Sequence, residues 1–145
     1  MVRDELKDGR RIAELLASEI DGRSRGPLGR LTVTNPDRSV EGTPTGERAY
    51  DVRRLRADRD PRREPAPDEA GRLFAQVYVH EDRARVELLD GLETAVEAAQ
   101  AGGLRVRPKA VRPPRTLVFV ERGSEVKRAV DVLEAAAESA GRSEK

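Results

Sequence analysis

The chain has 145 residues, of which 28 are basic and 27 are acidic, and its formal net charge is +1. The absence of cysteine excludes disulfides, thiolate metal sites and a cysteine nucleophile. No stretch approaches the ~18 consecutive apolar residues of a membrane span, and the charged N-terminus lacks the apolar core of a signal peptide. We therefore expect a single cytoplasmic domain that is not bound to a membrane.

The first half of the chain predicts one helix and four strands. Residues 4–20 carry apolar side chains at spacings of three and four, which is typical of an amphipathic helix, and Asp21-Gly22 is expected to end it. The best hairpin reverses at residues 81–83, between two segments in which apolar and polar residues alternate. The predicted strands are residues 28–34, 50–53, 73–80 and 84–89.

The second half predicts a helix, strands at 104–107 and 116–121, and a closing helix. Asp90 can cap the middle helix, which ends before Gly102, and Ser124 can cap the last one. The last strand is apolar at four consecutive positions, as in the middle of a sheet that is covered on both faces. Because strands joined by short turns usually pair antiparallel, we predict an α+β domain with a single, mostly antiparallel sheet and packed helices, in the order α-β-β-β-β-α-β-β-α.

Residues 56–71 interrupt this domain, which we take to span residues 1–145. They include four Arg, five acidic residues and three Pro, and no Val, Leu, Ile, Met or aromatic residue. Such a segment cannot bury enough apolar surface to offset the entropy of ordering it. We predict a flexible insertion here, and we expect residues 141–145 to fray from the last helix.

Few residues in the chain could carry catalysis. His80 is the only histidine, and because neighbouring side chains on a strand or turn point apart, we interpret it as a solvent-facing residue at a hairpin turn. Ser124 and Lys127 fit the Ser-x-x-Lys spacing of a nucleophile and its base, but the partner motifs of such enzymes are absent and Ser124 already serves as a cap. We therefore predict no catalytic residues, no metal site and no cofactor.

The most basic stretch of this arginine-rich chain surrounds its last predicted strands. Its positive side chains are Arg105, Arg107, Lys109, Arg112 and Arg115. Together they could neutralise phosphates, with Arg23, Arg25 and Arg30 extending the surface. The competing interpretation is a solvated loop, since the outer face of a strand is polar in any case and no aromatic residue is interleaved to stack a base.

A third possibility uses the acidic residues that precede this stretch. From Glu87 to Gln100 the chain carries four acidic residues and no basic one. The acidic and basic segments could pair within one chain or across a homodimer. Such pairs would set register more than stability, because an exposed pair contributes only about 0–1 kcal/mol.

Three segments carry a family resemblance: DGRRIAELLASEIDGR, VYVHEDRARVEL and RVRPKAVRPPRTLVFVERGSEVKRAVDVL. Outside residues 56–71 the chain resembles an uncharacterised family of small haloarchaeal proteins, and this resemblance implies no activity. Since the chain has a core but almost no catalytic residues, we hypothesise a non-enzymatic protein-interaction domain that forms a homodimer or binds a protein partner. The alternative is a module that binds an anion or nucleic acid through residues 105–115.

Overall fold

The computed structural model describes residues 8–24, 29–56, 58–60, 62–63 and 65–143. Its elements are α1 (Gly9–Ser24), β1 (Leu31–Thr34), β2 (Glu47–Leu55), η2 (Pro67–Glu69), β3 (Ala70–Val79), β4 (Ala84–Leu88), α2 (Leu92–Ala101), β5 (Arg105–Lys109), β6 (Arg115–Val120), η3 (Gly123–Glu125) and α3 (Val126–Ser143), where η marks a short 3₁₀ helix. The strands form one sheet in the order β1-β2-β3-β4-β6-β5, and each neighbouring pair is antiparallel. The predicted α+β class and order of elements are confirmed.

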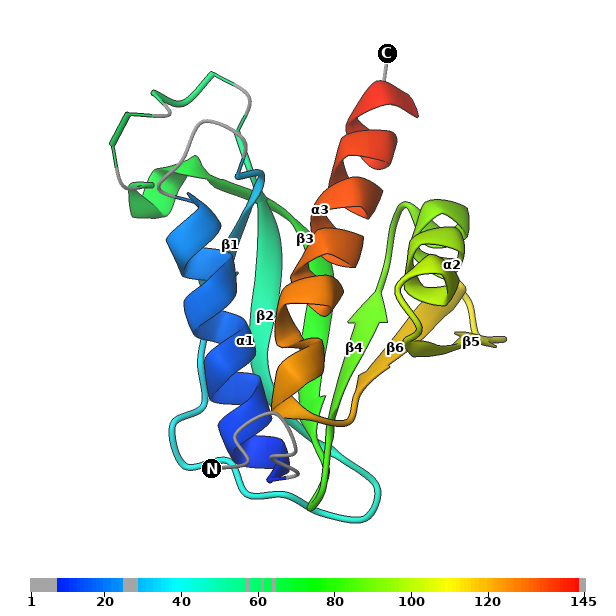
Figure 1. The fold of residues 1–145 in the computed structure, drawn as a ribbon. Coiled ribbons are helices and arrows are strands. Elements are labelled where there is room, and N and C mark those ends of the chain that lie inside the picture. Colours follow the sequence, from blue (N-terminus) through cyan, green and yellow to red (C-terminus); the bar gives the residue numbers. More distant parts are fainter. Residues whose placement is uncertain (1–7, 25–28, 57, 61, 64, 144–145) are drawn as a thin grey trace.

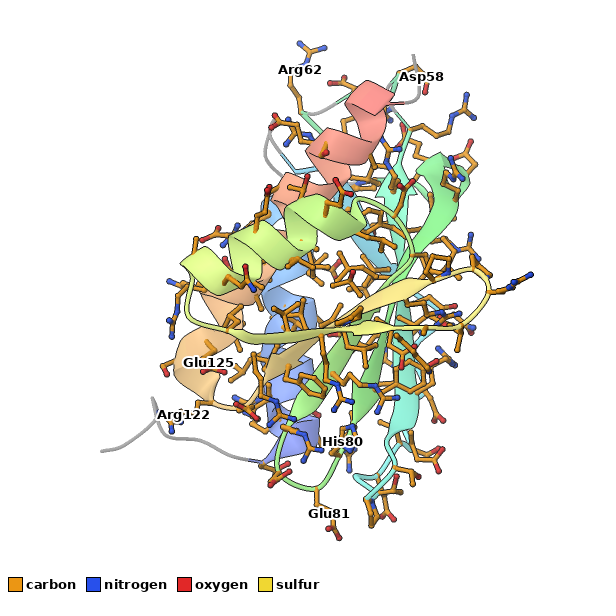
Figure 2. All side chains as sticks on the ribbon, turned by 90° about the vertical axis from the view of Figure 1, so that its right-hand side faces the viewer. Asp58, Arg62, His80, Glu81, Arg122 and Glu125 are labelled. Atoms are coloured by element: carbon orange, nitrogen blue, oxygen red, sulfur yellow. The ribbon has the colours of Figure 1, made fainter. Side chains whose placement is uncertain are left out.

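The helices α1, α2 and α3 lie on one face of the sheet (Figure 1). α1 contacts β1, β3 and β4, while α2 contacts β5 and β6 and packs against α3. Figure 2 shows the two layers from the side, with the helices to the left of the strands. None of the described helices covers the opposite face, which we call the open face. None of them is long and apolar enough to cross a membrane, and the cytoplasmic location stays a prediction.

The core lies between the helices and the sheet and is built from alternating strand residues. In β3 and β4, Val77 lies opposite Val86 and Val79 lies opposite Ala84, and all four side chains are buried. The predicted hairpin is therefore confirmed, including the shared face of its apolar residues. Phe74 is the additional residue of a bulge where β3 pairs with β2, and it is fully buried.

α1 ends later than the sequence predicts. The helix continues through Gly22 to Ser24, whose hydroxyl donates to the carbonyl of Asp21 (2.8 Å). Gly22 is exposed and a Cβ there would meet no other atom, so this glycine costs the helix only its low propensity, about 1 kcal/mol. The start of the predicted helix, at residues 4–7, and Leu28 of the first predicted strand lie outside the described residues.

The two predicted helix caps are wrong. Before α2 the cap position is Gly91, at φ 63°, and the carboxylate of Asp90 accepts from the adjacent amide of Gly91 (2.8 Å). Ser124 lies inside η3 with an exposed side chain, and α3 begins after it at Val126. In both places the local backbone leads into the helix without a capping side chain.

Part of the predicted insertion is built into the fold. β3 begins inside it, at Ala70, and the guanidinium of Arg59 donates to the carbonyls of Ser24 (3.0 Å) and Gly29 (3.2 Å). Arg59 is only 9% exposed, and its hydrogen bond to Ser24 connects this segment to the end of α1. The flexibility of the segment, like the fraying of the C-terminus, stays a prediction.

Candidate functional site

The open face is polar where it is formed by β3, β4, β6 and β5. Its side chains alternate with the buried core residues of the same strands. Glu87 of β4 lies between Gln76 of β3 and Leu117 of β6, and Arg107 of β5 lies beyond Leu117. The next row across the strands holds Tyr78, Arg85, Phe119 and Arg105. The prediction that the last strand is covered on both faces by packed elements is therefore wrong, because charged side chains cover the open face of β6.

The carboxylate of Glu87 occupies the centre of this face. It is 1% exposed, and it accepts hydrogen bonds from Nε of Arg85 (2.9 Å) and Nη1 of Arg115 (3.0 Å). Nζ of Lys109 lies 3.5 Å from each of its two oxygens. A carboxylate removed from water needs such partners, because the effective desolvation penalty of an ion is several kcal/mol. β4, β5 and β6 thus each supply a cation that compensates this charge.

A series of hydrogen bonds runs from this centre toward β2. Nη1 of Arg115 also donates to Oε1 of Gln76 (3.1 Å), and Nε2 of Gln76 donates to Oδ1 of Asp51 (3.0 Å). Asp51 is 7% exposed and also accepts from Nη1 of Arg48 (3.4 Å). These side chains of β2, β3, β4 and β6 therefore form one connected network, in which each group orients the next.

His80 closes one end of this network. It is 4% exposed, so the prediction that His80 faces solvent is wrong. Its Nδ1 lies 3.1 Å from the carbonyl oxygen of Pro44, and its Nε2 lies 2.8 Å from Nη1 of Arg85. Because arginine can only donate, Nε2 accepts, Nδ1 carries the proton and the imidazole is neutral. Burial lowers the pKa of His80, and the positive charges of Arg83 and Arg85 lower it further.

Two glycines let backbone segments approach this histidine closely. Gly46 has a φ of 90°, and a Cβ on it would lie 3.0 Å from Nε2 of His80. Gly9, the first residue of α1, donates its N–H to the carbonyl of Glu81 (3.2 Å), and a Cβ on it would clash with the carbonyl oxygens of His80 and Arg83. The turn between β3 and β4 is thus held by the helical layer and by the segment that leads into β2.

Arginine and aromatic side chains alternate across the open face. Cζ of Arg85 lies 4.5 Å from the ring centroid of Tyr78, and Cζ of Arg105 lies 4.4 Å from the ring centroid of Phe119. Phe119 is only 4% exposed, although it lies opposite Arg85 and Arg105 on the face without helices. No aromatic residue is interleaved with the basic residues along the chain, but the sheet brings the rings of Tyr78 and Phe119 among them in space.

A groove of about 540 Å³ lies over β4, β6 and β5. Its cationic lining residues are Arg83, Arg85, Arg105, Arg107 and Lys109. Glu87 is the only carboxylate among the described residues that line it, and Leu117 and Phe119 provide apolar surface. Arg107 is exposed and makes no ion pair with any residue in the described part of the chain. Outside the groove lining, Asp82 pairs with Arg83 (2.8 Å) and Glu121 pairs with Arg105 (2.9 Å). Arg107 is therefore the lining cation whose charge faces solvent without a carboxylate partner among the described residues.

The structure brings together most of the predicted basic stretch. Arg105, Arg107 and Lys109 line the groove, because alternate residues of β5 point to the same face. Arg115 lies beside them on the central carboxylate, whereas Arg112 is exposed in the loop between β5 and β6 and does not line the groove. These side chains point outward, as the solvated interpretation expects, but several of them converge on one concavity.

Arg83 and Arg85 are the lining residues that the sequence did not reveal. A signal was present in the segment RARVEL, where Arg83, Arg85 and Glu87 alternate with buried residues and so share one face of β4. The missing information was the pairing of β4 with β6, which places these residues across from β5.

The second predicted basic cluster lies elsewhere. Nη1 of Arg23 bonds to Asp131 (2.6 Å) and Nη2 of Arg30 bonds to Glu138 (3.0 Å), and both carboxylates belong to α3. These two arginines therefore lie on the helical side of the sheet, and the expectation that they extend the basic surface is wrong. Arg25 lies outside the described residues.

The enzyme-like patterns do not gather into one site. Ser124 is exposed in η3 and Lys127 is exposed in the first turn of α3. Figure 2 shows Glu125, next to Ser124, on the helical side and apart from His80. In the described ranges, no group of three His, Asp or Glu residues could hold a metal ion. The pairing of acidic and basic segments within one chain is seen at Glu87, which contacts Lys109 as well as Arg115.

Comparison with known proteins gives a family and no activity. A model described as a family of unknown function (DUF7993) matches residues 1–145. No curated protein and no solved structure matches the chain. The predicted resemblance to a family without an assigned function is confirmed, whereas its haloarchaeal source stays a prediction.

Proposed function

The chain belongs to the family of unknown function DUF7993, and because that family lends it no activity, we propose a function from the groove alone. The protein binds an anion that carries phosphate groups, and it does not catalyse a reaction on this ligand. The observation that carries the proposal is the set of five cationic side chains that line one groove. Asp82, Glu87 and Glu121 pair with four of them, and the fifth, Arg107, has no ion pair among the described residues. Of the functions that the sequence leaves open, this is the anion-binding alternative.

Phosphate oxygens suit these walls particularly well. A guanidinium presents a planar fork of donors that can bind two oxygens at once, and hydrogen bonds between charged partners are stronger than neutral ones. Arg107 lies on β5 beside Lys109, and its charge is not matched by any described carboxylate. The groove volume of about 540 Å³ falls within the ~300–1,000 Å³ of small-molecule sites.

A binding role is favoured over an enzymatic one by the state of His80. Both of its ring nitrogens are engaged, one with the carbonyl of Pro44 and the other with Arg85. A general base needs a nitrogen within reach of the proton that it removes. The other hypothesis, a homodimer or a protein partner, stays a prediction that light scattering of the purified protein can test.

The test is a calorimetric titration with pyrophosphate at low and at physiological salt. We expect binding that weakens as salt rises, because each neutralised phosphate charge releases counterions. The variant R107A/K109A should lower the affinity about tenfold or more, since each lost bond to a charged group is worth about 1.5–3 kcal/mol. The matched control is R38A, which removes an exposed arginine beside α1, far in the fold from the groove lining.

The control should bind pyrophosphate as the wild type does. The proposal fails if the wild type does not bind pyrophosphate at low salt. It also fails if R107A/K109A and R38A bind equally well, since the groove would then not be the site.

A further inference from the structure

Resting on this proposed function, we infer that the groove recognises a nucleotide, with the guanidinium of Arg105 as the surface on which the base stacks. Phosphate binding alone needs donors and positive charge. The groove offers in addition a flat, supported cation and apolar surface, and these features match a ligand that joins a planar ring to a phosphate.

Arg105 is held in place by Phe119 and Glu121. Its Cζ lies over the ring of Phe119, 4.4 Å from the ring centroid, so the ring supports the guanidinium from below. Its Nη1 donates to Oε2 of Glu121 (2.9 Å), which holds the group from its edge. The Arg105 side chain is nevertheless 53% exposed, so it is accessible to a ligand.

The exposed guanidinium of Arg105 has the chemistry of a stacking surface for a base. Nucleobases stack on guanidinium planes as well as on aromatic rings, and a ring behind the guanidinium fixes its orientation. Phe119 is 4% exposed, so it supports Arg105 and is itself covered. Phe119 is thus a positioning residue, and Arg105 provides the contact with the base.

The guanidinium of Arg105, which we call the platform, lies close along β5 to the cations that bind the phosphate. Alternate residues of a strand lie about 6.6 Å apart, and Arg107 and Lys109 follow Arg105 at such steps along β5. Leu117 lies opposite Arg107 and lines the groove, so apolar surface of β6 lies beside the phosphate site. A ligand with a planar ring at one end and phosphates at the other fits this order of groups.

The experiment compares adenosine 5′-diphosphate with pyrophosphate, which share the diphosphate and differ in the base and sugar. We expect the wild type to bind the nucleotide about tenfold more tightly, since stacking of one base contributes about 1–3 kcal/mol. R105K keeps the charge and removes the plane, so it should lower the ratio of nucleotide affinity to pyrophosphate affinity about tenfold. R107K is the matched control, and it should weaken both ligands to a similar extent.

A second variant, F119L, removes the ring behind the platform and keeps an apolar side chain. It should reproduce the selective loss of nucleotide affinity seen with R105K, and circular dichroism should verify that it is folded. If F119L and R105K weaken the two ligands equally, or if the wild type does not distinguish them, the inference is overturned and the proposed function stands. If the wild type binds neither ligand, both are overturned.

A series of oligothymidylates identifies the source of the nucleotide. Affinity that rises with the number of nucleotides indicates a single strand that follows β5, because successive phosphates then meet successive cations. Affinity that does not change with length indicates a free nucleotide. Either result supports the platform, provided that R105K weakens binding.

Discussion

The two faces of the sheet are made by the same strands and hold together by different physics. On the helical side, β3 and β4 present Val77 and Val86, which are buried and pack in the aliphatic core. On the open side, the residues between them present a buried carboxylate at Glu87 and the cations around it. Burial of apolar area stabilises the first face. On the second face, the cations around Glu87 compensate its charge, and Arg107 adds a positive charge that no described carboxylate pairs with. The comparison teaches that one face can maintain the fold while the other carries the groove for which we propose ligand binding.

The largest difference is expected from truncating an apolar residue on each face. F74A should lower the free energy of unfolding by about 4 kcal/mol, because it leaves a cavity at a fully buried site. L117A on the open face should cost about 1 kcal/mol or less, because Leu117 is partly exposed. Urea denaturation of both variants measures the contrast. Equal losses would mean that the open face depends on apolar packing as much as the core does.

The next effect concerns the central carboxylate. E87Q should lower the free energy of unfolding by about 2 kcal/mol, because Arg85, Arg115 and Lys109 lose their shared counter-charge. The same variant should bind pyrophosphate more tightly, since these cations become available to the ligand. Thermal denaturation and calorimetry on one protein sample measure both quantities. A fall in affinity together with stability would contradict the assignment of Glu87 as a competitor of the anion.

Two tyrosines allow a smaller comparison between the faces. The hydroxyl of Tyr50 is buried on the helical side and donates to the carbonyl of Ala13 in α1 (2.9 Å). Y50F should cost about 1 kcal/mol, because this acceptor loses its bond in a dry environment. The hydroxyl of Tyr78 donates to Gln76 (3.3 Å) on the open face, where water can replace it, so Y78F should cost less. Chemical denaturation distinguishes the two, and a larger loss for Y78F would reverse the comparison.

The smallest effect is a pH dependence that originates at His80. The folded protein lowers its pKa below the ordinary 6.5, so the unfolded chain binds the proton more readily. Stability is therefore unaffected above about pH 6.5 and decreases as pH falls through the lowered pKa. H80N should flatten this decrease, because asparagine does not titrate. Its amide can still donate to the carbonyl of Pro44, so the contact of the histidine is kept. Burial raises the pKa of Glu134, so only the difference between wild type and variant reports on the histidine. Identical pH profiles would assign the dependence to another group.

The order of elements could be predicted because apolar periodicity is local. The hairpin of β3 and β4 needs only alternation and a short turn, and the helices need only spacings of three and four. The helix starts could not be predicted from Asp90 and Ser124, because Gly91 and a 3₁₀ turn replace the expected caps. Local patterns thus predict which elements exist better than they predict where each begins.

The groove could be predicted only in part. Alternation in the predicted strand at residues 104–107 places Arg105 and Arg107 on one face, and β5 extends this face to Lys109, beyond the predicted end of the strand. That Arg85 lies near them depends on β4 pairing with β6, and α2 separates these strands in the chain. The burial of His80 depends likewise on Pro44, 36 residues earlier. Such long-range pairings have no local pattern, so the sequence alone could not reveal the concavity.

The contact between α1 and the turn after β3 links the two layers of the molecule. The amide of Gly9 donates to Glu81, in the same turn as His80 and Arg83, which line the groove. We expect an anion that displaces either side chain to shift the carbonyl that this amide meets. Deuterium uptake at the first residue of the helix should then change with occupancy on the opposite surface, without any label in the groove itself.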